Sequence, residues 1–137
     1  MKTKRLNKQR FTVQTNTECV KDNLTGLIWA RNANQLGRVT WFNALSSCNN
    51  LNYGGKTDWR LPTIQELCSL IDYSNFCPAL PTGHPFNVVQ LDYYWSSATY
   101  ANGADYAWCV FLYHGLVDVS TKVTAYYAWP VRGGQKR

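Results

Sequence analysis

The chain has 137 residues and a formal net charge of +6, a length that fits one domain with a single sizeable core. Apolar residues make up 45% of the chain and charged residues only 16%, which excludes disorder along its whole length. No apolar run approaches the roughly 18 residues that a membrane-spanning helix needs, so we expect no membrane span.

The positive charge lies at the two ends of the chain. Five basic residues occupy positions 1–10 and three occupy positions 132–137, whereas residues 11–131 hold six basic and eight acidic residues. A basic face for nucleic acid across the domain is therefore excluded. We predict a basic flexible tail over residues 1–10, as a solvated tail or an electrostatic anchor. One domain over 11–135 and a short tail over 136–137 would follow.

The sequence shows neither a signal-peptide pattern nor a metal-binding motif. The basic N-terminus is typical of the start of a signal peptide, but no apolar stretch follows it, so we expect no signal peptide in this chain. No CxxC occurs, which argues against a zinc knuckle. The sequence is compatible with two states of its cysteines. Either one disulfide forms, with Cys68 and Cys77 as the nearest pair in sequence, or all thiols are reduced. The five cysteines are Cys19, Cys48, Cys68, Cys77 and Cys109.

Short strands are expected first. Phe11–Val13 is predicted to begin the first strand, and residues 19–21 and 27–30 to form the next two. The residues between these two strands are typical of a hairpin turn, with Gly26 supplying a positive φ.

Two amphipathic helices are predicted next. Apolar residues at positions 41, 45, 48 and 51 share one helical face, with Thr40 as the N-cap and an end near Asn49. Thr63 and Glu66 form a capping-box sequence, and Pro62 prevents a helix from entering from upstream. Positions 64, 67, 70 and 71 would form the buried stripe of this second helix.

Strands return after an irregular connection over residues 74–92. The candidates are residues 94–97, 107–113, 116–119 and 128–132, with Gly115 in a hairpin turn. Helices followed by a strand meander predict an α+β fold, with two helices packed on small antiparallel sheets. The expected core residues are Trp29, Trp41, Leu45, Trp59, Leu61, Leu67, Leu70, Trp95, Trp108, Val110, Val117 and Val131.

Catalytic motifs are missing from the sequence. The acids are scattered singly, so a carboxylate pair would have to be assembled by the fold, and the two histidines have no cysteine at a recognisable spacing. Asp58 and Arg60 flank Trp59 and are either a ligand-contacting pair or an ion pair that fixes the entry to the second helix. We predict no enzymatic activity, no cofactor and no metal site.

Several segments together resemble the Lcl C-terminal domain family, named for a collagen-like bacterial adhesin. Residues 22–29 (DNLTGLIW) resemble the family's opening segment, and residues 58–63 (DWRLPT) with Glu66 and Leu67 resemble its central signature. The helix beginning at Trp41, the YWSS of 94–97 and the PVRGGQ of 130–135 complete the match. The resemblance covers roughly residues 11–135.

This resemblance implies a C-type lectin-like fold in a module that is displayed on a bacterial cell surface, secreted or phage-associated. It implies a homo-oligomer, a trimer, and the binding of sulfated glycans. The calcium-binding triplets of classical C-type lectins are absent here, so no Ca²⁺ site is expected. An enzyme like the formylglycine-generating relatives of the fold would need paired reactive cysteines, and Cys109 has no obvious partner.

The stretch from Tyr93 to Ala128 has an unusual composition. Among its 36 residues, Lys, Arg, Glu, Gln and Met occur once, at Lys122, and the stretch is rich in Tyr. Strand alternation predicts Trp108, Val110 and Leu112 inward and the intervening side chains outward. We expect a ligand-binding face for a protein or glycan receptor on another cell or host surface. Its candidate residues are Tyr100, Asn102, Asp105, Cys109, Phe111, Tyr113, His114, Leu116, Asp118, Ser120, Thr121, Thr124 and Tyr126.

The same composition has a second interpretation in the genetic code. Mutation of the adenines in AAC or AAT codons cannot produce Lys, Glu, Gln, Met or Trp. Residues of about 98–128 would then be the hypervariable face of a protein diversified by a diversity-generating retroelement. A fixed ligand face with a strand-biased composition is the alternative, as is an adhesin domain that binds sulfated glycans.

Overall fold

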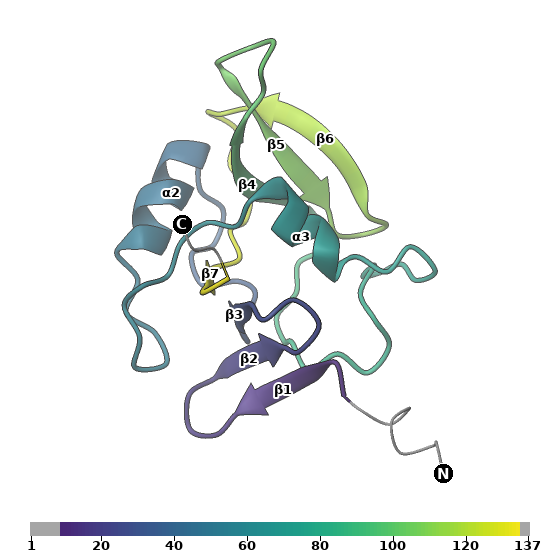
Figure 1. The fold of residues 1–137 in the computed structure, drawn as a ribbon. Coiled ribbons are helices and arrows are strands. Elements are labelled where there is room, and N and C mark those ends of the chain that lie inside the picture. The colour runs from purple at the N-terminus through teal and green to yellow at the C-terminus, as the bar shows by residue number, and fades with distance from the viewer. Residues whose placement is uncertain (1–8, 135–137) are drawn as a thin grey trace.

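A computed structural model describes residues 9–134, which form two antiparallel sheets and two helices (Figure 1). The four-stranded sheet has the order β1 (Phe11–Gln14), β2 (Cys19–Asp22), β3 (Ile28–Ala30) and β7 (Val131–Arg132). The three-stranded sheet comprises β4 (Tyr93–Thr99), β5 (Tyr106–Phe111) and β6 (Leu116–Thr121). The helices are α2 (Trp41–Asn49) and α3 (Ile64–Leu70). The predicted α+β class is confirmed.

Local chemistry sets the ends of both helices. The Thr40 side chain accepts a hydrogen bond from the Asn43 N–H at the start of α2. Thr63 and Glu66 form the complete capping box at the start of α3, which satisfies two backbone donors that have no partner inside the helix. Arg60 extends this box, because its guanidinium donates to both carboxylate oxygens of Glu66 at 2.7 and 2.8 Å.

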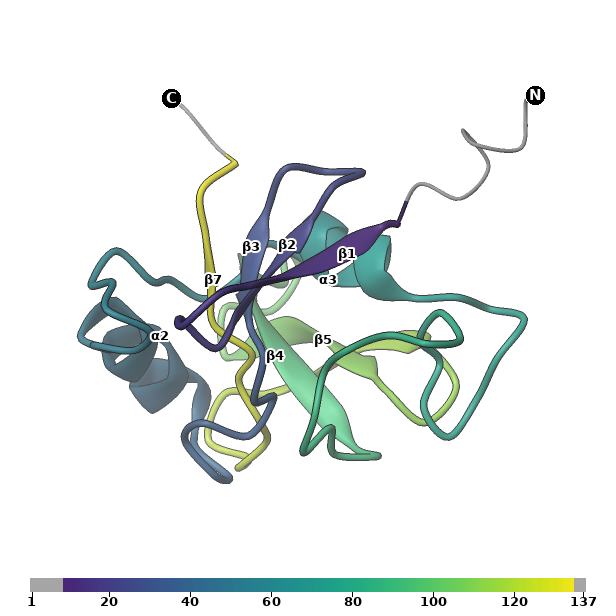
Figure 2. The same cartoon turned by 90° about the horizontal axis from the view of Figure 1, so that it is seen from below.

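The C-terminal segment passes beside β4 and then forms β7 of the four-stranded sheet (Figure 2). Tyr126 exchanges backbone hydrogen bonds with Val39, and the Tyr127 carbonyl accepts one from Trp95 N–H at 2.9 Å. Further along, β7 exchanges backbone hydrogen bonds with Arg60 and pairs with β3. The segment therefore connects strands and loops that are far apart in the sequence.

Strand β4 of the three-stranded sheet has buried side chains on both of its faces. Along β4, Tyr94 belongs to the larger core cluster, with Trp29 and Trp129, and the adjacent Trp95 belongs to a second cluster beside α2. Because neighbouring strand residues point to opposite faces, β4 is covered on both faces at these two residues. Leu45, Trp108 and Val117 are only half-buried, contrary to the prediction, whereas the other expected core residues are buried.

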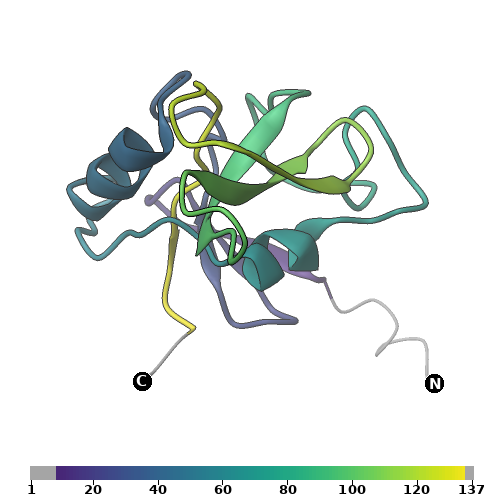
Figure 3. The ribbon, with the colours of Figure 1, turned by 90° about the horizontal axis from the view of Figure 1, so that it is seen from above.

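The irregular connection of residues 74–92 packs against the far end of the β5–β6 hairpin. Cys77 N–H donates to the Tyr113 carbonyl at 2.7 Å, and Ala79 N–H donates to the Leu112 carbonyl at 2.9 Å. This connection and α2 lie at opposite ends of the molecule (Figures 1 and 3). None of the helices within residues 9–134 has the length and apolar character to span a membrane.

The predicted tail boundary at residue 10 is wrong, because Arg10 is part of the fold. Its guanidinium donates two hydrogen bonds to the fully buried Asp22 carboxylate, at 3.0 and 2.8 Å, and one to the Ser69 carbonyl. Burial raises the pKa of Asp22, but the hydrogen bonds from Arg10 and from Leu24 N–H outweigh it, so the pKa lies below its ordinary value. Residues 1–8 of the predicted tail, and residues 135–137, lie outside the described residues.

We predict that Arg10→Ala lowers the free energy of unfolding by about 3 kcal/mol at pH 7, because it leaves a buried carboxylate without its cation. In the wild type, the low pKa of folded Asp22 adds stability above the pKa of the unfolded chain, about 4, and this stability is lost as the pH falls. Urea denaturation between pH 3 and 7, with the exposed Lys21→Ala as control, measures both effects. Equal stability of the two variants would contradict the prediction.

Trp59→Ala tests the placement of the central signature segment. Trp59 is 2% exposed, and its indole N–H donates to the Tyr53 carbonyl at 3.1 Å. We expect a loss of about 3–5 kcal/mol, from the cavity and the lost burial. Leu24→Ala, at a side chain that is 73% exposed, should change the denaturation midpoint little. A Trp59→Ala midpoint as high as that of the wild type would refute this placement.

Candidate functional site

Strand register places a row of side chains on one face of the three-stranded sheet. Tyr93 lies opposite Phe111, which lies opposite Leu116, and Cys109 lies opposite Asp118. Beyond them, Ala107 lies opposite Ser120. We call the exposed and half-buried part of this row, with the adjoining hairpin and C-terminal side chains, the aromatic face. It comprises Tyr93, Phe111, Tyr113, His114, Leu116, Asp118, Ser120 and Tyr126.

Aromatic rings contact one another along this face. The Tyr93 ring lies 4.7 Å from that of Phe111 and 5.0 Å from that of Tyr126, measured between centroids. The Phe111 ring in turn lies 6.0 Å from Tyr113 and 5.0 Å from His114. Tilted, stacked and edge-on pairs at these separations are the favourable arrangements for aromatic side chains. The rings thus hold each other in place before any ligand arrives.

Two polar contacts cross the aromatic face between strands. The Tyr93 hydroxyl donates to Asp118 Oδ2 at 3.4 Å, and the Ser120 hydroxyl donates to the Tyr126 hydroxyl at 3.2 Å. Burial raises the pKa of Tyr93, and the nearby Asp118 carboxylate raises it further. Tyr93 therefore stays a neutral hydrogen-bond donor near pH 7, and Asp118 supplies the negative charge.

The predicted site residues fall into separate groups. Phe111, Tyr113, His114, Leu116 and Asp118 lie together, with Ser120 and Tyr126 beside them. A second group lies in the β4–β5 loop and comprises Tyr100, Asn102 and Asp105. A third lies at the end of β6 and in the turn that follows, and comprises Thr121 and Thr124, whose hydroxyl oxygens are 2.7 Å apart.

Tyr100 does not join the aromatic face. Its ring packs edge-on against Trp108 at 5.4 Å, and Trp108 alternates with Cys109 along β5, so it belongs to the opposite face of the sheet. Asn102 and Asp105 are exposed in the same loop. The predicted site is thus broader than the set of side chains that the fold brings together.

The prediction that Cys109 faces outward is wrong. The residue is fully buried, in the cluster with Trp95, Ala107 and Ala128. It does lie on the same side of the sheet as Phe111, as the alternation predicted, but α2 and the C-terminal segment cover its end of that side. Its small side chain lies below the aromatic face and makes no exposed surface.

Two aromatic residues outside the predicted site residues are relevant to this site: Tyr93 belongs to the aromatic face, and Phe76 borders it. Tyr93 begins β4, and only the β4–β5 register shows that it lies beside Phe111. Phe76 is 67% exposed in the irregular connection, and its ring lies 6.4 Å from that of Tyr113. Nothing local in the sequence indicates this second contact, because it depends on how the connection packs against the hairpin.

Lys122 contributes no positive charge to the aromatic face. Lys122 is only 8% exposed. Its ammonium donates to the Thr99 hydroxyl at 2.9 Å and lies over the Trp41 ring, 4.1 Å from the ring centroid. A cation over an indole face is favourable. The single basic residue of the Tyr93–Ala128 stretch therefore ties the end of β6 to α2.

Asp58 and Arg60 do not pair with each other. Asp58 accepts hydrogen bonds from Arg132 at 2.6 and 3.1 Å, and Arg60 binds Glu66 and the Gly133 carbonyl. Each residue thus ties the segment before α3 to another element. The predicted mutual ion pair is wrong.

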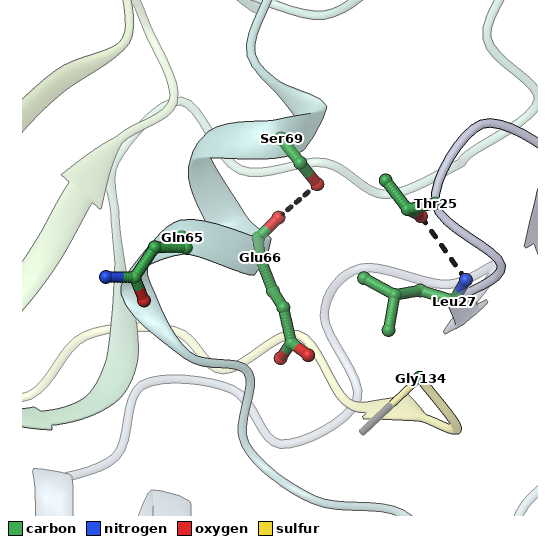
Figure 4. A pocket seen from close by; sticks show the side chains of 6 residues that line it. All are labelled: Thr25, Leu27, Gln65, Glu66, Ser69 and Gly134. Carbon is green, nitrogen blue, oxygen red and sulfur yellow. Dashed lines mark hydrogen bonds between the residues drawn. The ribbon is translucent and has the colours of Figure 1, made fainter. Parts of the chain in front are cut away.

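A hollow of about 290 Å³ lies beside α3 and is lined by Thr25, Leu27, Gln65, Glu66, Ser69 and Gly134 (Figure 4). Its one carboxylate, on Glu66, is held by Arg60 and by the Thr63 N–H at 2.9 Å. The Ser69 hydroxyl donates to the Glu66 carbonyl at 2.6 Å. The fold itself engages these polar groups, so we do not choose this hollow as the candidate site.

All five cysteines are free thiols. Burial raises the pKa of the Cys48 thiol to about 12 and is the main cause of a pKa of about 12 at Cys109, whereas Cys77 is exposed. In the part of the chain from residue 9 to 134, no group of three or more His, Cys, Asp or Glu side chains is placed to hold a metal ion.

The sequence model of the Lcl C-terminal domain matches residues 18–132. The chain belongs to the Lcl C-terminal domain family. The matched range contains the whole aromatic face. A search of curated protein sequences gave no match to the chain.

We predict that thiol-reactive reagents label Cys77 first in the folded protein at pH 8. Thiolates are the reactive species, and burial keeps Cys48 and Cys109 protonated and covered. Mass spectrometry of timed labelling, with a urea-unfolded sample as control, measures the order. Rapid labelling of Cys109 in the folded protein would contradict the structure.

Proposed function

We propose that this domain is a non-catalytic binding module whose aromatic face binds a protein receptor. The observation that carries the proposal is the row of contacting rings, beside which Tyr113, His114 and Leu116 are exposed. Among the described residues, no Lys or Arg belongs to this face. Tyr113 is 38% exposed and Leu116 is 46% exposed. Exposed apolar surface of this kind is typical of interaction sites, and tyrosine-rich surfaces supply rigid contact area at low entropic cost.

The sulfated-glycan alternative finds less support in the charges of the described residues. Arg10, Arg38, Arg60 and Arg132 each form an ion pair with an aspartate or glutamate. Lys122 is buried over Trp41, and the exposed Lys21 and Lys56 lie outside the aromatic face. A sulfated glycan needs several free cations on one surface, whereas the exposed ionised side chain on the aromatic face is Asp118.

The family and the α+β architecture support the finer parts of the proposal. The two helices and two small antiparallel sheets are compatible with a C-type lectin-like fold. In this proposal the module is displayed at a cell surface, secreted or phage-associated, and contacts a receptor on another cell or host surface. A homo-oligomer, such as a trimer, would present several aromatic faces at once and would raise the avidity for a multivalent surface.

Diversification by a retroelement is part of the proposal for the exposed positions only. Tyr113, His114, Leu116 and Asp118 are exposed, so changing them leaves the core intact. Cys109 and Leu112 are also within the reachable codon set, but both are buried, and core substitutions cost stability. We therefore assign these two positions to the constant scaffold.

The combined variant Phe111→Ala, Tyr113→Ala, His114→Ala tests the binding face. Arrays of surface-protein ectodomains and of glycans should show a protein receptor for the wild type. We expect the triple variant to bind that receptor at least about 30-fold more weakly, because central aromatic anchors carry most of the energy of an interface.

The matched control is Leu24→Ala with Tyr106→Ala, which removes exposed apolar side chains elsewhere. Circular dichroism and a thermal melt confirm that each variant is folded. Unchanged receptor binding by a folded triple variant would overturn the proposal. Binding of the wild type to sulfated glycans alone, retained by the triple variant, would favour the adhesin alternative.

For diversification, the checking observation is genomic. A near-identical template repeat, with adenines at the codons of the exposed positions and next to a reverse-transcriptase gene, is the expected result. Without such a repeat the diversification hypothesis fails, but the binding face is unaffected.

A further inference from the structure

Among residues 9–134, no cation forms an ion pair with Asp118, the ionised group of the aromatic face. Asp118 lies near the middle of β6, opposite the buried Cys109. Among the described residues, no Lys, Arg or His nitrogen lies within 4.0 Å of its carboxylate, although Asp22, Asp58, Glu66 and Asp92 each have an arginine partner. Asp118 is therefore an exposed aspartate whose charge the described part of the fold does not neutralise by an ion pair.

Aromatic groups border this carboxylate. Tyr93 reaches Oδ2 through its hydroxyl, and the centroids of the Phe111 and Tyr126 rings lie 4.7 and 5.0 Å from that of the Tyr93 ring. The face of an aromatic ring carries partial negative charge and attracts cations. The rings and the carboxylate thus favour the same kind of guest, and the Lys122 ammonium, bound to Thr99 and over Trp41, does not compete for them.

We infer that the aromatic face recognises a basic side chain of its protein partner, an arginine that lies across the rings and donates to Asp118. This inference rests on the proposed function and names the chemistry of the partner. Arginine suits the site better than lysine, because its planar guanidinium both stacks on aromatic rings and donates two parallel hydrogen bonds to a carboxylate.

The position of Asp118 prepares it for such a guest. Its Oδ1 already accepts the Val119 N–H at 2.8 Å, which fixes the orientation of the carboxylate. The contact from Tyr93 at 3.4 Å is long for a hydroxyl donor. A carboxylate has about four acceptor positions, so Asp118 keeps acceptor capacity for the two N–H groups of a guanidinium.

The experiment uses N-acetyl-arginine N-methylamide as the probe and its citrulline counterpart as a neutral control of similar shape. Titration of each probe into the full chain is followed by NMR of the ring protons of Tyr93, Phe111 and Tyr126. The arginine probe should shift these signals, and the citrulline probe should bind more weakly. Raising the ionic strength from about 0.01 to about 1 M, which shortens the Debye length from about 30 to 3 Å, should weaken only the arginine probe.

Asp118→Asn is the decisive variant, because the amide oxygen can still accept the Val119 N–H while the charge is removed. We expect arginine binding to weaken about two- to fivefold, the range for a solvent-exposed ion pair. Asp105→Asn, at the other exposed aspartate of this stretch, is the matched control and should leave binding unchanged.

Three outcomes would overturn the inference: equal binding of citrulline, no ring shifts with arginine, or wild-type affinity of Asp118→Asn. Methyl glucoside, titrated in the same way, is the carbohydrate probe. Ring shifts with this probe but not with the arginine probe would overturn the inference in favour of carbohydrate stacking. Failure here is separable from failure of the proposed function. If the Phe111, Tyr113, His114 variant loses the receptor but Asp118→Asn binds it with wild-type affinity, the aromatic face remains the binding site and the arginine inference is wrong.

Discussion

The backbone of residues 126–132 connects the three-stranded sheet to the four-stranded sheet. Tyr126 pairs with Val39, Tyr127 with β4, and Val131 with Arg60 and β3. The Trp129 indole N–H adds a buried hydrogen bond to the Ala30 carbonyl at 2.9 Å. Each sheet is small, and three-stranded sheets need a packed face to be stable. The shared segment supplies that packing to both sheets at once, and it also positions Tyr126 beside Tyr93.

Much of the fold follows from chemistry that is local in the sequence. The hairpin around Gly26, whose φ is +80°, and the caps at Thr40 and Thr63 depend on residues within a few positions of each other, so their sequence signals were sufficient. Gly115, with a φ of +89°, likewise marked the β5–β6 turn. Hydrophobic spacing located both helices for the same reason.

The errors share one physical cause, which is pairing across long sequence distances. Cys109 was expected outside because alternation identifies two faces of a strand but does not say what covers each. Asp58 was expected to pair with its near neighbour Arg60, yet Arg132 arrives from the other end of the chain through β7. Arg10 was assigned to the tail by charge alone, although its partner Asp22 is buried on the adjacent strand. The aromatic face was predicted in part, since the composition indicated the stretch but not the members.

The hydrogen bond from Val119 to Asp118 also matters for self-association. Strand β6 is at the edge of its sheet, and edge strands offer unpaired backbone groups to other chains. Half of its residues are β-branched, and none is Lys or Pro, so side-chain type offers little protection. By occupying the Val119 N–H at 2.8 Å and placing a negative charge at the rim, Asp118 obstructs the addition of a further strand. A surface rich in exposed rings can then coexist with a sheet edge that resists strand addition.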